Sequence, residues 1–170
     1  TVNRIPNAFA ADASLCSGQT TNINITNPNT VPLTTFTWTV QTVVNVSGAS
    51  GGSGNLIAQT LASADAINEG TVTYLIQPTA AGCSGTPYAV SVVVAPIPDV
   101  AASPQTICSG TSTSVAITNP NGVPGTIFNW TVFSVTNVSG AAAGNGNTIS
   151  QVLTSTDGVN TGTVTYRITP

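Results

Sequence analysis

The chain has 170 residues, a formal net charge of −3 and only 4% charged residues, against about 25% in an average globular protein. It contains no His and no Met, and its two cations are Arg4 and Arg167. Clusters of Lys and Arg, which neutralise nucleic-acid phosphates and bind anionic membrane surfaces, are therefore missing. No apolar run approaches the roughly 20 residues of a membrane helix. We expect neither a nucleic-acid partner nor membrane insertion.

Apolar and polar residues alternate in short segments along the first half of the chain. In chain order these segments are residues 21–26, 35–40, 55–61, 70–76 and 88–94. Strict alternation over short runs rich in Val, Ile and Thr is typical of half-buried β-strands. The side chains expected on the buried faces are Ile23, Ile25, Phe36, Trp38, Val40, Ile57, Leu61, Val72, Tyr74, Ile76, Tyr88, Val90, Val92 and Val94.

The segments between these strands carry turn chemistry and no helical periodicity. They read NPNTVP, SGASGGSGN and PTAAGCSGTP, which are rich in the residues that favour turns. Short strands separated by turns, in units of about 100 residues, favour antiparallel β-sandwiches. The sequence therefore predicts an all-β protein made of immunoglobulin-like sandwiches.

The second half of the chain repeats the first without gaps. The offset is 92 positions, as from Cys16 to Cys108 and from Trp38 to Trp130, and about 38 of the 67 pairs between residues 12–78 and 104–170 are identical. We therefore predict two tandem domains. Their expected bounds are repeat 1 at 12–97, a proline-rich linker at 98–103 and repeat 2 at 104–170, preceded by an arm at 1–11 that ends an earlier repeat.

Three cysteines stand at related places in the repeat. Cys16 precedes the first long strand, and Cys83 lies in the turn before the last strand of repeat 1. We predict a disulfide between them, which would place the protein in an oxidising, extracellular setting. The matching partner of Cys108 would stand at position 175, so we expect Cys108 to be unpaired in this chain, either free or paired outside it.

Catalytic and metal sites are not expected. Without His or Lys, the chain lacks the base that activates a nucleophile, and five scattered acids do not form a pair of apposed carboxylates. Asp65 and Asp157 match between the repeats. One Asp per domain is too few for calcium, which favours several converging oxygens, so a turn-stabilising cap is the preferred interpretation. We expect no cofactor.

The surface must be covered by Thr, Ser, Asn and Gln, because charges are so few. Four N-x-S/T sequons mark possible glycosylation sites. They stand at Asn24, Asn45, Asn129 and Asn137.

Several short sequence segments of the repeat resemble those of a known family. They are the ICSG start, the FNWTV strand, the GTVTY strand and, in the first copy, the GCSGTP turn followed by YAVSVVV. Together they resemble the PKD-like and Ig-like tandem repeats of large secreted surface proteins of Bacteroidota, including gliding-motility adhesins. The resemblance implies an extracellular, non-catalytic module that supplies reach, stiffness or adhesion.

Repeat 2 stops before the equivalents of Tyr88, Val90, Val92 and Val94. Its last segment, around Val164, Tyr166 and Ile168, should therefore present an unpaired strand edge that another strand completes. Two routes are open: a continuous array of which this chain is a window, or strand donation between separate chains. The N-terminal residues Thr1, Val2 and Ile5 are the candidate donors in the second route. The first route is preferred, because Val2 and Ile5 are out of phase.

The expected function is thus a structural one, a fibre, filament or stalk built from copies or adjoining repeats placed head to tail. The alternative is an adhesion module that binds a glycan or a protein. Carbohydrate sites use exposed aromatic platforms, and most aromatic residues here fall in the buried phase of strands. The sequence therefore favours the structural function.

Overall fold

The computed structural model describes residues 2–170, which divide into unit 1, ending at Ile97, and unit 2, Pro98–Pro170. Strands and turns make up this described part of the chain, and it holds no helix that is long and apolar enough to cross a membrane. The all-β prediction is confirmed.

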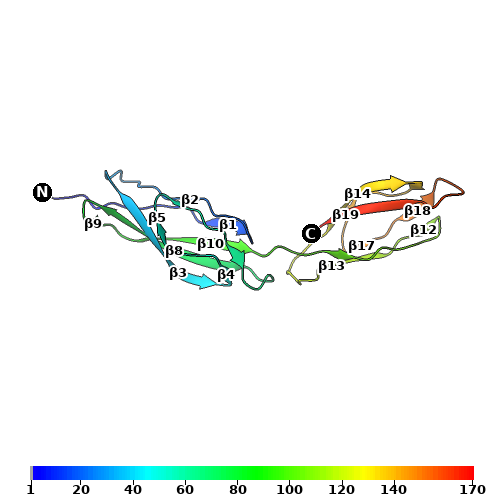
Figure 1. The fold of residues 1–170 in the computed structure, drawn as a ribbon, viewed down its shortest axis with the longest axis horizontal. Coiled ribbons are helices and arrows are strands. Elements are labelled where there is room, and N and C mark those ends of the chain that lie inside the picture. Colours follow the sequence, from blue (N-terminus) through cyan, green and yellow to red (C-terminus); the bar gives the residue numbers. More distant parts are fainter. Residues whose placement is uncertain (1) are drawn as a thin grey trace. The chain divides into compact units, whose positions relative to one another are not determined.

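Unit 1 contains the first ten strands (Figure 1). They are β1 (Ala13–Cys16), β2 (Ile23–Asn24), β3 (Thr35–Val44), β4 (Val46–Ser47), β5 (Gly52–Ser53), β6 (Leu56–Ile57), β7 (Ala62–Ser63), β8 (Gly70–Ala80), β9 (Cys83–Ser84) and β10 (Tyr88–Ala95).

The strands of unit 1 form a large sheet and two short ladders. The large sheet has the order β1-β10-β8-β3-β5, with β9 paired to β8, and the ladders are β2-β6 and β4-β7. Between these layers lies a continuous apolar core that includes Ile23, Trp38, Ile57 and Tyr74. The alternation in the sequence produces this core, because every second side chain of a strand points to the same face. The predicted sandwich is confirmed.

Unit 2 contains the remaining strands. They are β11 (Ala101–Ala102), β12 (Thr111–Ser112), β13 (Val115–Thr118), β14 (Asn129–Thr136), β15 (Val138–Ser139), β16 (Gly144–Asn145), β17 (Thr148–Ile149), β18 (Val152–Ser155) and β19 (Thr163–Thr169). They form three short sheets, β16-β14-β19, β11-β13-β17 and β12-β18-β15, around a smaller core that contains Ile117, Phe128, Trp130 and Ile149.

The two units repeat the same irregularities as well as the same strands. The pairing of β3 with β8 shifts register between Val40 and Thr42, and the pairing of β14 with β19 shifts between Val132 and Ser134. Each shift is a β-bulge, in which one strand carries an extra residue. The bulges stand 92 positions apart, so unit 2 is built on the same plan as unit 1.

The domain boundaries differ from the prediction at both ends. Ala8 and Ala10, assigned to a separate arm, are buried in the core of unit 1, and Phe9 pairs with Thr26. The expected linker is also structured, since β11 pairs with β13 and Val100 packs on the core of unit 2. The prolines near these two segments predict backbone without regular pairing. Nevertheless, Phe9 and residues 101–102, which lie close to these prolines, form β-pairs.

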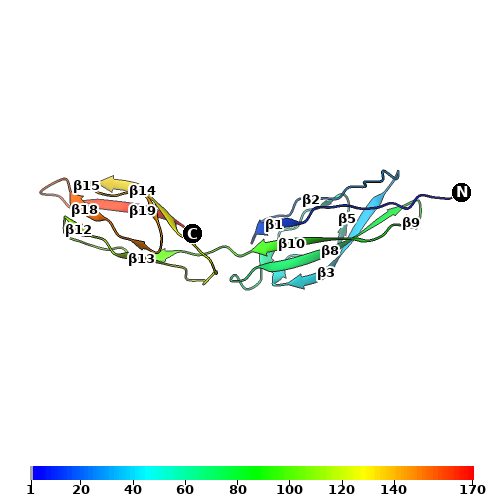
Figure 2. The ribbon, with the colours of Figure 1, turned by 180° about the vertical axis from the view of Figure 1, so that it is seen from behind.

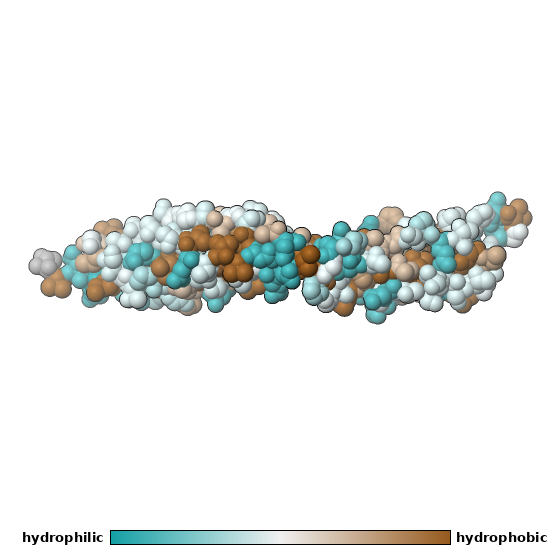
Figure 3. Space-filling model, turned by 90° about the horizontal axis from the view of Figure 1, so that it is seen from below, coloured by the Kyte–Doolittle hydropathy of each residue, from teal (hydrophilic) through white to brown (hydrophobic). Residues whose placement is uncertain are grey.

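The surface matches the composition. Figure 3 shows, on the face that it presents, pale and teal atoms with patches of apolar residues between them. Exposed apolar side chains include Leu33, Val44 and Ile97 of unit 1 and Ile127 and Val159 of unit 2.

Candidate functional site

The last strand of unit 1, β10, lies between two neighbouring strands (Figure 2). It runs parallel to β1, with Val92 beside Ala13 and Ala95 beside Cys16. It runs antiparallel to β8, with Val92 opposite Val72. The strand that starts the repeat and the strand that ends it are therefore direct neighbours in the sheet.

The inward side chains of β10 fill the centre of unit 1. Val90, Val92 and Val94 are 0% exposed. The side chains that face this core from β8 are equally inaccessible to solvent; they are Val72, Tyr74 and Ile76, all 0% exposed. Each fully buried side chain of this size contributes roughly 1.5–3 kcal/mol by leaving water, so β10 is a major part of the stability of unit 1.

In unit 2 the corresponding edge is open. Within the described residues, β19 has β14 as its one strand neighbour, whereas its equivalent β8 has both β3 and β10. The side chains Val164, Tyr166 and Ile168, which match the fully buried trio of β8, are only half-buried. The prediction that β19 presents an unpaired edge agrees with this pairing pattern.

A hollow of about 410 Å³ lies along this open edge. Residues 105–109, which match β1 and its following turn, line one wall, and residues 160–164 at the start of β19 line the other. Leu153 and Val138 also line it. The equivalent space in unit 1 is filled by the second half of β10, from Val92 to Ala95, because that segment lies between β1 and the start of β8. We call this hollow the strand groove.

The walls of the strand groove carry hydrogen bonds that are also found in unit 1. The Gly110 N–H donates to the Leu153 carbonyl at 2.8 Å, and the Gly18 N–H donates to the Leu61 carbonyl at 2.7 Å. The Ser155 N–H donates to Ser109 Oγ at 2.9 Å, as the matching residues of unit 1 do at 3.0 Å.

A second set of bonds fixes the core behind the groove. The Tyr166 hydroxyl donates to Gln151 Oε1 at 2.7 Å, and Tyr74 makes the same bond to Gln59. Thr113 Oγ donates to the Ile149 carbonyl at 2.8 Å. Since these contacts recur without β10, the groove is already shaped for a strand.

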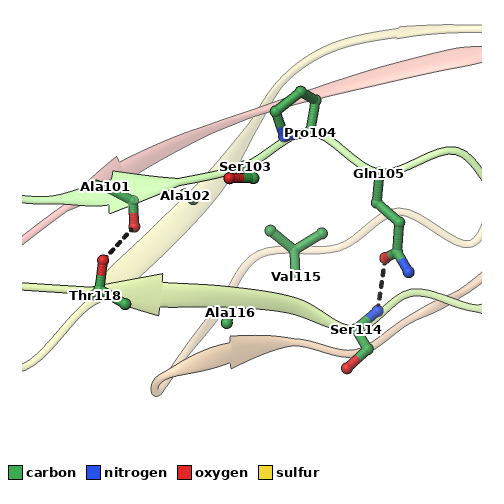
Figure 4. A pocket seen from close by; sticks show the side chains of 9 residues that line it. All are labelled: Ala101, Ala102, Ser103, Pro104, Gln105, Ser114, Val115, Ala116 and Thr118. Carbon is green, nitrogen blue, oxygen red and sulfur yellow. Dashed lines mark hydrogen bonds between the residues drawn. The ribbon is translucent and has the colours of Figure 1, made fainter.

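Another hollow of unit 2, about 430 Å³, opens between residues 101–105 and β13 (Figure 4). Its side chains are small or uncharged, and two hydrogen bonds cross it: Thr118 Oγ1 donates to the Ala101 carbonyl at 3.3 Å, and the Ser114 N–H donates to Gln105 Oε1 at 2.8 Å. A site for a charged or catalytic group would need titratable side chains, and the lining of this hollow supplies none.

Comparison with known families decides the class of this chain. A model of the PKD-like domain matches residues 13–98 and again residues 105–170. The chain belongs to the PKD-like domain family. The first match falls almost entirely within unit 1 and the second within unit 2, so each unit contains one PKD-like domain.

Comparison with solved structures aligns this chain with several two-domain or multidomain chains. The extracellular cadherin domains 3–6 of Protocadherin Gamma B2 align at 9% identity and a TM-score of 0.42, covering 96% of this chain and 48% of that one. The two immunoglobulin domains of DIP-gamma align at 12% identity and a TM-score of 0.40, covering 97% and 96%.

The adhesin InvE of Yersinia pseudotuberculosis aligns at 17% identity and a TM-score of 0.29, covering 95% of this chain and 54% of that chain. This chain therefore spans about half the length of the protocadherin and InvE chains. No curated protein matches the sequence.

The predicted disulfide is wrong. Cys16 lies beside Ala95 at the end of β10, whereas Cys83 pairs with Ala80 in the turn before β10 begins at Tyr88. An eight-residue strand at about 3.3 Å per residue separates these two ends of the PKD-like domain, far beyond the roughly 4.4–6.8 Å between Cα atoms that a disulfide needs. All three cysteines are free, and Cys108 is an exposed thiol that lines the strand groove.

The predicted N-terminal donor residues lie on unit 1. Val2 is 98% and Ile5 63% exposed, and the Ile5 carbonyl accepts a hydrogen bond from Asn29 Nδ2 at 2.9 Å. Thr1 lies outside the described residues. Pro6, which directly follows Ile5, is fully buried. Because this segment is anchored on its own PKD-like domain, it is a poor donor for a second chain.

The four sequons occupy different environments. Asn24 in β2 and Asn129 in β14 are exposed, whereas Asn45 and Asn137 are partly buried and have positive φ angles of 52° and 55°. The Asn45 side chain donates to the Asn68 carbonyl at 2.8 Å. A glycan on this nitrogen would compete with that bond, so Asn24 and Asn129 are the better candidates for modification.

The loop before β8 is organised by Asp65, and that before β19 by Asp157. Asp65 Oδ1 accepts the N–H groups of Ile67 and Asn68, each at 2.9 Å, and Oδ2 accepts Asn68 Nδ2 at 2.7 Å. Asn45 Nδ2 adds a fourth donor at 3.1 Å. These contacts match the turn-stabilising cap that the sequence favours. In residues 2–170, no group of three His, Cys, Asp or Glu side chains is placed to hold a metal.

Stability should fall in acid because of this cap. Hydrogen bonds from the Asn68 side chain, from the Asn68 and Ile67 backbone and from Asn45 hold the pKa of Asp65 well below its ordinary value. A carboxyl whose pKa is lower in the folded state contributes stability above its unfolded pKa of about 3.9 and loses it as the pH falls towards the folded value. We expect the urea concentration at which unit 1 is half unfolded to decrease once the pH falls below about 4. In Asp65→Asn this decrease should be smaller.

The measurement is Trp38 fluorescence in a Trp130→Phe background, followed against urea at pH 2 to 7. Asp157→Asn is the matched control, because it removes the equivalent cap from unit 2 and should leave the Trp38 signal unchanged. An identical acid slope in Asp65→Asn and the parent chain would contradict the prediction.

Phe133 is an exposed aromatic residue that the sequence reasoning did not single out. Phe133 is the extra residue of the β14 bulge and is 62% exposed, with the Arg167 guanidinium 4.6 Å from its ring centre. Alternation could have found it, because Phe128, Trp130 and Val132 take the inward positions of this segment and Phe133 follows on the outward face.

Proposed function

We propose that this chain is a non-catalytic structural segment of an extracellular bacterial fibre, filament or adhesin stalk, in which PKD-like domains follow one another head to tail. The observation that carries the proposal is the parallel pairing of β1 with β10 in unit 1. These are the strands through which tension would pass into and out of the domain. A pull on both ends would therefore load their hydrogen bonds together, in shear, instead of opening them one at a time.

The surface composition supports an extracellular, load-bearing role. A chain with 4% charged residues is covered mainly by hydroxyl and amide groups, and two PKD-like domains occur in tandem. Within such an array we propose that the open edge of β19 is completed by a strand from the polypeptide that follows unit 2. That strand would give unit 2 the same pairing between its first and last strands that unit 1 has.

The test is to stretch the full chain from its two ends in a single-molecule force measurement. Unit 1 should open at a markedly higher force than unit 2, because β1 and β10 bind each other while residues 105–108 of unit 2 have no strand partner among the described residues. Two events of equal force, or a single weak one, would contradict the load-bearing role.

A matched pair of proline variants makes this test specific. The Ser17 N–H donates to the Ala95 carbonyl at 2.7 Å, whereas the Cys16 N–H donates to Gln19 Oε1 at 3.0 Å. Successive N–H groups of a strand point to opposite edges, so Ala13 directs its N–H towards β10 and Ser14 directs its own outward. Ala13→Pro should lower the opening force of unit 1, and Ser14→Pro should change it far less.

A further inference from the structure

Resting on the proposed array, we infer that the strand groove recognises one extended strand of the β10 type in one direction and one register. The strand runs antiparallel to β19 and parallel to residues 105–108. Its residue matching Val92 lies opposite Val164, and its residue matching Ala95 lies beside Cys108. Unit 1 is the basis of this assignment, because it contains the same site with the strand in place.

The inward positions of the strand must be small, branched and apolar. In unit 1 these positions are Val90, Val92 and Val94, all fully buried. The outward positions Ala89 and Ser91 are exposed, and the outward positions Val93 and Ala95 are half-buried. No charged side chain lines the strand groove, so a charge at an inward position would be buried without a partner, which opposes binding. The occupant is therefore an uncharged strand with valine or a similar branched apolar residue at each inward position.

The two units differ at the other end of the strand. In unit 1 the Tyr88 ring packs against Phe9, with ring centres 5.6 Å apart, and the Ser91 N–H donates to Asp12 Oδ1 at 2.8 Å. Unit 2 has Ala101 in place of Phe9 and Pro104 in place of Asp12. Both contacts are lost there, so recognition by unit 2 depends on the half of the strand that matches Val92 to Ala95.

Cys108 provides a direct readout of register. Its equivalent Cys16 is the neighbour of Ala95 on the parallel strand, and neighbouring residues on adjacent strands lie about 4.8 Å apart, within disulfide range. A peptide with the sequence of residues 86–95 and the change Ala95→Cys should therefore form a disulfide with Cys108. The chain for this test is the full length carrying Cys16→Ser and Cys83→Ser, which leaves Cys108 as its one thiol.

The comparison peptide carries Val93→Cys, with Ala95 kept, and a scrambled peptide ending in Cys is the control for sequence. In a buffer of reduced and oxidised glutathione, glutathione disulfide accepts the two electrons that the new disulfide releases. We expect the Ala95→Cys peptide to be captured by Cys108 at least about tenfold faster than the Val93→Cys peptide or the scrambled peptide, because binding raises the local thiol concentration to about the millimolar range. The same peptide without Cys should raise the unfolding midpoint that Trp130 reports in a Trp38→Phe background, since it binds only the folded state.

The inference would be overturned if all three peptides formed the disulfide with Cys108 at the same rate. It would also be overturned if the peptide without Cys left the unfolding midpoint reported by Trp130 unchanged. Dimers of the peptide-free chain in sedimentation would overturn it as well, because they would mean that a second copy covers the edge. None of these outcomes bears on the force measurement on unit 1. The load-bearing function can therefore stand if the strand inference falls, and the reverse is also true.

Discussion

Adding the missing strand should stabilise unit 2 by about 3 kcal/mol or more. The change is an extension after Pro170 with the sequence of residues 79–95, which supplies the equivalents of β9 and β10. Three valines would become buried, at roughly 1.5–3 kcal/mol each, and the ordering of the added residues offsets part of that gain. For a domain of this size, about 3 kcal/mol corresponds to a rise of at least about 12 °C in Tm.

Thermal unfolding followed by Trp130 fluorescence, with Trp38→Phe to silence unit 1, measures this gain. The matched control is the same extension with serine at the three positions that match Val90, Val92 and Val94. It adds the same length of chain but no apolar side chains for the groove. We expect the control to leave the Tm of unit 2 near that of the parent chain, and equal gains from both extensions would contradict burial as the cause.

A single charge in β10 should unfold unit 1 and leave unit 2 intact. Val92 is 0% exposed and lies between Ala13 and Val72. Val92→Asp would place a carboxylate in this core without a partner, at a cost of several kcal/mol. A whole domain has only about 5–15 kcal/mol of stability, so we expect unit 1 to be largely unfolded at 25 °C.

The two tryptophans report this result separately when each is measured with the other changed to Phe, because the chain has one in each unit. In Val92→Asp, Trp38 should show the emission of an unfolded chain while Trp130 keeps its native emission. Ala89→Asp is the control, since Ala89 is an exposed residue of the same strand and a charge there remains in water. Loss of both signals in Val92→Asp would mean that the two units do not unfold independently.

Much of the fold could be predicted from alternation and from the repeat. The inward positions Ile57, Leu61 and Val72 were predicted because period two fixes which side chains share a face of a strand, and each is fully buried. The open edge of β19 was predicted because one copy of the repeat contains a strand for which the other has no counterpart. Both predictions depend on local pattern, which a single sequence contains.

The failures concern contacts that local pattern does not determine. Cys16 and Cys83 stand near the two ends of one repeat, but strand direction places them at opposite ends of β10. The strand groove was missed as a shaped site because its walls come from segments as distant as Ser109 and Val164, which only the folded topology brings together.

Amide hydrogen exchange along β19 tests the central claim most directly, with the parent chain and its β10-type extension compared residue by residue. In the parent, we expect slow exchange for the β19 amides that face β14 and fast exchange for those that face the open edge, whereas the amides of β8 should be slow on both sides. The extension should make both sets in β19 slow. The account would be contradicted if β19 of the parent were as protected as β8, or if the extension left its open-edge amides fast.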